Sequence, residues 1–131
     1  MIRAPTEHEE QKAVIEWRDN VAVLKHRRHC MPDGRFPLIA IPNGGLRNVI
    51  VARKLKAEGV TAGVPDLFLP IPRTPYHGLW IEMKRRKGGR VSPDQVAVIA
   101  GLRASGYHVV IARGSDEAIA AIEEYLEGGL R

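Results

Sequence analysis

The sequence has a single cysteine, no long apolar run and fewer acidic than basic residues. Cys30 has no partner for an internal disulfide, so a reducing, intracellular environment is the default expectation. No segment approaches the roughly 20 apolar residues that a membrane-spanning helix needs. The segment that follows Met1 lacks the apolar core of a signal peptide. Together these absences predict an intracellular protein without a membrane segment.

The shortage of acidic residues gives the chain a clear positive charge. Lysine and arginine total 20 against 15 aspartates and glutamates, which leaves a net charge of +5. The sequence pI is about 9.7. Three cations fall within 25–28 and five within 84–90, so the charge is clustered. A clustered basic charge favours a polyanionic partner such as a nucleic acid.

The length and the order of elements predict one α/β domain. A chain of 131 residues is long enough for one compact domain, assigned here to 1–131. Apolar periodicity and turn residues predict helices at 7–25, 48–58, 92–105 and 115–126, and strands at 38–41, 66–69, 79–84 and 107–111. This order indicates a central mixed sheet of about four strands flanked by helices.

Local signals mark where several helices begin. Thr6 followed by Glu9 forms a capping box, and so does Ser92 followed by Gln95. Ser115 is expected to cap the last helix. Within 7–25, an apolar stripe at helical spacing is expected to face the core; it consists of Val14, Trp17, Val21 and Leu24.

The predicted strand at 79–84 carries the chemistry. Side chains alternate between the two faces of a strand. The core-facing set is Leu79, Ile81 and Met83, and the opposite set is Trp80, Glu82 and Lys84. A carboxylate and an ammonium therefore project side by side from a rigid element. Asp66 begins a neighbouring strand and reaches the same place if the two strands pair.

Paired carboxylates beside a lysine suit phosphodiester hydrolysis. Asp66 and Glu82 would supply the oxygen ligands that Mg²⁺ prefers. A divalent cation there would activate water and neutralise phosphate charge, and Lys84 could stabilise the developing negative charge. The alternative for Glu82 and Lys84 alone is a surface ion pair. The adjoining strand and the basic run that follows favour the catalytic interpretation.

At this point several segments together resemble a known family, the VRR-NUC (virus-type replication-repair nuclease) branch of the PD-(D/E)xK nuclease superfamily. The resemblance extends from about residue 6 to 126. Its segments are Glu7 to Gln11, Ile41 to Gly45, Gly63 to Leu67, Glu82 to Lys84, Ser92 to Gln95 and Gly106 to Val110.

The resemblance implies a restriction-endonuclease-like core and a Mg²⁺- or Mn²⁺-dependent endonuclease. It implies that Asp66 and Glu82 bind the metal, with the Met83 carbonyl as a further ligand, and that Lys84 is catalytic. Gln95 and a glutamate of the first predicted helix, 7–25, would complete the site. Gln95 also fits its capping box, and the two roles are compatible.

Two glutamates of the first predicted helix, Glu7 and Glu10, are candidates for the remaining metal ligand. Glu10 is favoured over Glu7 as a metal ligand because it continues the buried stripe of the helix towards the sheet. Stand-alone family members of this size are typically phage-encoded. The resemblance therefore also implies a homodimer that acts on branched DNA such as Holliday junctions. Alternatives are a flap or nicking nuclease acting on single strands or simple duplexes, and a basic DNA-binding module without catalysis.

The remaining candidates concern DNA contacts. Those expected to reach DNA are Asn43, Arg47, Arg85, Arg86, Lys87 and Arg90, with Lys25, Arg27 and Arg28 as further phosphate contacts. A zinc site at His26, His29 and Cys30 is disfavoured because a second pair of ligands is missing.

Overall fold

The computed structural model describes residues 3–42 and 49–128. The elements are α1 (Glu7–Trp17), η1 (Arg18–Ala22), α2 (Val23–Lys25), η2 (Arg27–His29), β1 (Ile39–Ala40), α3 (Val49–Ala57), β2 (Leu67–Leu69), β3 (Leu79–Lys84), α4 (Pro93–Ala104), β4 (His108–Arg113) and α5 (Ser115–Glu127). This order confirms the expected α/β class. The expected DNA contacts Asn43 and Arg47 lie outside the described residues.

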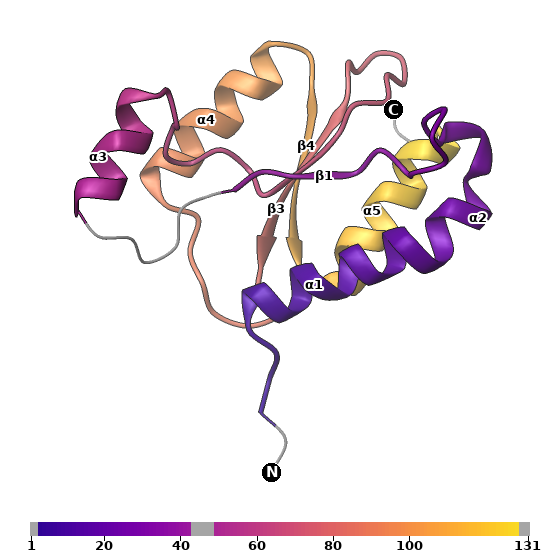
Figure 1. Ribbon diagram of the computed structural model, residues 1–131, viewed down its shortest axis with the longest axis horizontal. Helices are drawn as coiled ribbons and strands as arrows, with labels where there is room; N and C mark the ends of the chain where they lie inside the picture. Colours follow the sequence, from indigo (N-terminus) through magenta and orange to yellow (C-terminus); the bar gives the residue numbers. More distant parts are fainter. Residues whose placement is uncertain (1–2, 43–48, 129–131) are drawn as a thin grey trace.

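The sheet contains four strands in the order β1-β2-β3-β4. Strand β2 runs antiparallel to both β1 and β3, and β3 pairs parallel with β4, so the sheet is mixed as expected. Figure 1 shows α1, α2 and α5 on one side of the sheet and α4 with α3 on the other. Among the helices of the described segments, none combines the length and apolar character needed to span a bilayer.

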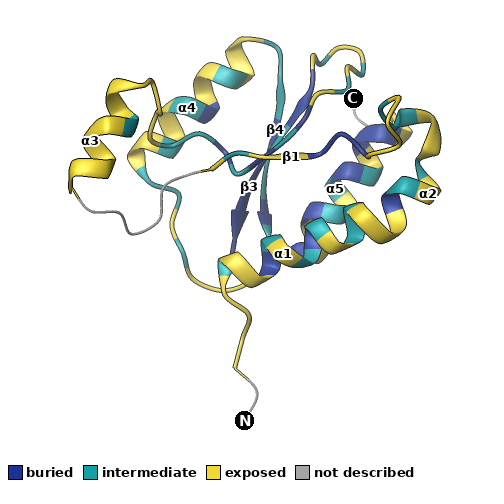
Figure 2. Ribbon diagram, viewed as in Figure 1, coloured by how far each residue is buried: buried dark blue, intermediate teal, exposed yellow. Residues whose placement is uncertain are grey.

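The core lies between the sheet and the α1/α5 layer (Figure 2). Leu79, Ile81 and Met83 are buried there, which confirms the face expected for them. Glu82 and Lys84, on the alternate positions, contact α4 on the other face of the sheet instead. Alternation along β3 therefore separates the apolar core from a polar layer beneath α4.

The first helix departs from the expected apolar stripe. Its middle, η1, is π-helical and holds one residue more per turn than an α-helix. The extra residue shifts the buried face, so that Val14 is followed in the core by Ala22, eight positions on. Val21 and Leu24 are exposed as a result, and their expected burial is wrong. Trp17 is half-buried against the core.

Two of the three expected helix caps are present. Thr6 and Glu9 form one capping box, and Ser92 and Gln95 form the other. The expected Ser115 cap is wrong, because Gly114 occupies the capping position and Ser115 is already the first helical residue. With no capping side chain at Gly114, the Ser115 N–H donates to the Glu10 carboxylate instead, at 3.0 Å.

Candidate active site

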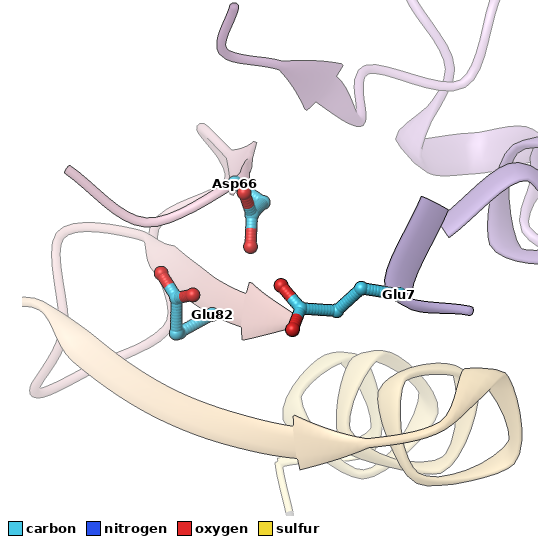
Figure 3. A group of neighbouring side chains, drawn as sticks. All are labelled: Glu7, Asp66 and Glu82. Atoms are coloured by element: carbon cyan, nitrogen blue, oxygen red, sulfur yellow. The ribbon is translucent and has the colours of Figure 1, made fainter. Parts of the chain in front are cut away.

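Three carboxylates meet at the end of the sheet. Oxygen atoms of Glu7, Asp66 and Glu82 lie within 4.8 Å of one another. Figure 3 shows the three side chains directed towards a common point, from the start of α1, the residue before β2 and the body of β3. Three elements distant in sequence therefore supply one acidic cluster.

Strand register explains why Asp66 and Glu82 meet. Leu67 pairs with Ile81 across the antiparallel β2–β3 ladder. Continuing this register by one residue places Asp66 opposite Glu82, where side chains on the same face lie close together. The Asp66 carboxylate also accepts the Met83 N–H at 2.8 Å, which fixes its position. The convergence expected if the two strands paired is present.

Glu82 occupies an unusual environment for a carboxylate. Its side chain is 2% exposed. Burial raises the pKa of Glu82 to about 8, and the negative charge of Asp66 adds to the rise while Lys84 opposes it. Within the part of the chain that the structure describes, Glu82 Oε1 is a buried polar atom without a hydrogen-bond partner. An unpaired, buried carboxylate oxygen beside two further carboxylates is suited to a cation.

The raised pKa of Glu82 predicts a pH-dependent stability in metal-free buffer. Native Glu82 keeps its proton up to about pH 8, whereas the unfolded chain releases it near 4.5. The unfolded state therefore binds fewer protons between these values, and the contribution of Glu82 to the free energy of unfolding falls as pH rises from about 5 to 8. Denaturant unfolding in EDTA should show this fall, and Glu82→Gln should remove it. Identical pH profiles for both proteins would contradict the prediction.

Lys84 and Gln95 complete the polar layer. The buried Lys84 Nζ donates to Gln95 Oε1 at 3.0 Å and lies 3.6 Å from Glu82 Oε2. Gln95 Nε2 donates to the same Glu82 oxygen at 3.0 Å. Gln95 Oε1 also accepts the Ser92 N–H at 2.9 Å and so caps α4. One carboxamide thus serves both as the helix cap and as the link between the lysine and the glutamate.

A cleft of about 870 Å³ opens beside the cluster. The walls include Glu7, Asp66, Glu82 and Gln95 together with residues of α3 and of the segment 59–64. Gly63 brings that segment close to α4: its φ is +91°, and a Cβ there would lie 2.5 Å from the Asp94 backbone. Only glycine accepts both constraints. The cleft was not expected from the sequence, because its walls depend on the tertiary placement of α3.

Glu10 lies away from the cluster, contrary to the preference for it as the helix-1 ligand. Its buried carboxylate accepts Arg86 Nε at 2.7 Å and the Ser115 N–H at 3.0 Å. Burial opposes ionisation, but these donors hold the pKa of Glu10 below its ordinary value. The expected burial of Glu10 is present, yet it places the carboxylate against the α5 N-terminus, where a negative charge is favourable. Glu7, one turn earlier, reaches Asp66 and Glu82 instead.

We expect Glu10→Ala to destabilise the fold. The change leaves the Ser115 N–H without its acceptor and Arg86 without its main partner, at a cost of about 1–3 kcal/mol in the free energy of unfolding. The exposure of Arg86, 46%, keeps the expected cost below that of a fully buried ion pair. Glu16→Ala, an exposed change on the same helix, should shift stability by no more than about 0.5 kcal/mol. Equal midpoints of urea unfolding for the two variants would contradict this role of Glu10.

The basic residues that follow β3 differ in their surroundings. Arg86, expected to contact DNA, also lies 3.4 Å from Asp116, so its guanidinium is engaged within the protein. Arg85, Lys87 and Arg90 are exposed and remain candidate phosphate contacts. At the far end of the first helix, Lys25 forms an ion pair with Glu123 at 2.7 Å.

The donor set fits a hard divalent cation. The cluster offers carboxylate oxygens only, which are the ligands that Mg²⁺, Mn²⁺ and Ca²⁺ prefer over softer metals. Glu7 and Asp66 are less buried than Glu82 and border the open cleft. The cluster therefore leaves room for water and for a substrate oxygen.

The four-stranded mixed sheet, the acidic cluster and the adjoining lysine define a nuclease-type α/β domain with a restriction-endonuclease-like fold. The family model of the VRR-NUC domain matches residues 6–116. A solved structure described as a VRR_NUC domain protein is 32% identical, covers 97% of this chain and 93% of its own, and has a TM-score of 0.76. A search of curated proteins finds no match. The chain belongs to the VRR-NUC family.

Proposed function

We propose that the protein is a metal-dependent DNA endonuclease that hydrolyses phosphodiester bonds. The observation that carries this proposal is the meeting of Glu7, Asp66 and Glu82 beside the buried amine of Lys84. A purely DNA-binding module would gain nothing from three carboxylates facing a polyanion, because they repel phosphate. Membership of a nuclease family supports the same conclusion.

Glu7, Asp66 and Glu82 are the proposed metal ligands, and Mg²⁺ or Mn²⁺ is the proposed ion. Glu7 takes the helix-1 position here in place of Glu10. The Met83 carbonyl stays a prediction as a further ligand. When bound, the cation supplies Lewis acidity, which makes water more nucleophilic and neutralises charge on the scissile phosphate.

Lys84 has the proposed role of stabilising negative charge on the phosphate. Its amine is held by Gln95 Oε1 and by Glu82, so it needs little rearrangement during the reaction. Gln95 orients both groups through its two ends. It is therefore a positioning residue in this proposal.

A cleavage assay with defined DNA structures tests the function. The protein is incubated with labelled linear, flap, nicked and four-way DNAs in Mg²⁺, in Mn²⁺ and in excess EDTA. We expect cleavage with the metals, preferentially of branched DNA, and none in EDTA. Full cleavage in EDTA would overturn metal dependence. Equal cutting of all four DNAs would overturn the preference for branched DNA and leave the nuclease proposal standing.

A homodimer is also proposed. Resolution of a four-way junction requires two cuts on symmetry-related strands, and each chain offers one acidic cluster in the part that the structure describes. A two-fold dimer would present two such sites to a two-fold substrate. Light scattering measures the mass, and a junction labelled on two arms shows whether the cuts are paired. A monomer producing unpaired nicks would overturn this proposal.

A further inference from the structure

The wall of the cleft that α3 contributes has features that the acidic cluster does not explain. Helix α3 contains no buried residue, so it adds little to the core. Ala52, Leu55 and Lys56 line the cleft at spacings of three and four, which is one face of the helix. The segment that follows adds Val60 and Val64, together with smaller residues. One cleft thus joins a carboxylate cluster, a lysine and an aliphatic surface.

The three surfaces differ in chemistry, and each suits a different part of a nucleotide. The exposed ammonium of Lys56 suits a phosphate, as a point charge on a flexible stem. Aliphatic side chains suit the flat face of a base or a sugar, which gain from leaving water. At about 870 Å³, the cleft is in the size range of sites that enclose a small organic molecule.

We propose that this cleft binds an unpaired nucleotide adjacent to the scissile phosphodiester, with Lys56 on its phosphate and Leu55, Val60 and Val64 against its base. This inference rests on the proposed nuclease function and narrows its substrate class. In a paired duplex the base faces are covered by their stacked neighbours, and the outside offers phosphates, sugars and base edges. A nucleotide at a branch point, flap or bulge can place its base against a protein surface.

Binding in EDTA tests the proposal without cleavage. Two duplexes of the same sequence are compared, one fully paired and one with a single unpaired 2-aminopurine, whose fluorescence reports stacking. We expect tighter binding of the second duplex and a change in emission when the protein is added. Equal affinity for the two DNAs with unchanged emission would overturn the proposal.

Matched variants on α3 locate the binding site. Leu55→Ala should weaken binding of the unpaired duplex about fourfold for each methylene group that no longer packs on the base, and should reduce the emission change. Ile50→Ala makes a similar truncation at an exposed position outside the cleft, so it should change neither quantity. Alanine favours the helical state, so both variants should keep α3. Equal effects of the two variants would overturn the assignment of the base to the cleft.

The phosphate contact has its own control. Lys56→Ala should reduce the slope of log affinity against log salt by about one, as expected when one lysine no longer neutralises a phosphate. Lys54→Ala removes the same charge from the same helix outside the cleft and should leave the slope nearer its original value. Indistinguishable slopes for these two variants would overturn the role of Lys56.

The two proposals fail in different ways. If the protein cuts DNA with Mg²⁺ but binds both duplexes equally, the nucleotide site is refuted and the nuclease function stands. If it prefers the unpaired duplex but cuts no DNA with any divalent metal, the nuclease function is refuted and the binding site stands.

Discussion

Asp66→Asn should reduce metal-dependent cleavage to below about one-thousandth of the wild-type rate. Loss of a single neutral donor to a transition state costs about 10²–10³ in rate, and a charged ligand at the metal should cost more. The asparagine carbonyl can still accept the Met83 N–H that Asp66 accepts at 2.8 Å, so the β2–β3 connection should remain. Gel assays under single-turnover conditions measure the rate, and circular dichroism confirms the fold.

Glu82→Gln should have a similarly large effect, because glutamine cannot ionise to become the anionic ligand that Glu82 would give a bound cation. Asp19→Asn is the matched control: Asp19 is exposed and bonded to the neighbouring Arg18, outside the cluster. It should cleave at the wild-type rate. A folded Asp66→Asn variant with wild-type turnover would refute the assignment of the cluster as the metal site.

Lys84→Ala is expected to lower the cleavage rate by about 10²–10³ while leaving metal binding largely intact. Lys84 is 5% exposed, and its Nζ lies 3.6 Å from Glu82 Oε2. From this position it can reach a phosphate held at the cluster. The fold should survive because Gln95 Oε1 keeps its bond from the Ser92 N–H. The effect should appear in kcat, whereas the Mg²⁺ concentration at half-maximal activity should change little.

Lys12→Ala provides the comparison for that variant. Lys12 is exposed on α1 and lines neither the cluster nor the cleft. Its removal lowers the net charge by the same amount, so it controls for general electrostatic attraction of DNA. Near-normal kcat in Lys84→Ala would mean that the lysine only balances the charge of its neighbours.

Much of the fold could be predicted from sequence because its signals are local. Alternation along 79–84 identified both faces of β3, and capping boxes located the starts of α1 and α4. The pairing of Asp66 with Glu82 required only that adjacent strands form an antiparallel ladder. These features depend on neighbours within a few residues or on one strand pairing.

The remaining features depend on how elements dock. Glu7 and Glu10 lie one turn apart, and the packing of α1 against α5 and β3 decides which of them reaches the sheet end. The π-helical turn changed the buried side of the first helix without an obvious sequence signal. Arg86 is one more cation of the basic run by sequence, whereas its bond to Glu10 joins residues 76 positions apart. The contribution of α3 to the cleft likewise has no local signature.

The double use of Gln95 constrains what evolution or a designer can place at this position. A capping box accepts glutamate as readily as glutamine, so a search that optimises helix stability alone has no reason to keep the amide. Glutamate here would set a further negative charge 3.0 Å from Glu82, in place of the amide N–H that now donates to it. Selection for helix stability and selection for the proposed activity therefore diverge at this residue. A library screened only for folding would admit substitutions that we expect to disrupt the proposed active site.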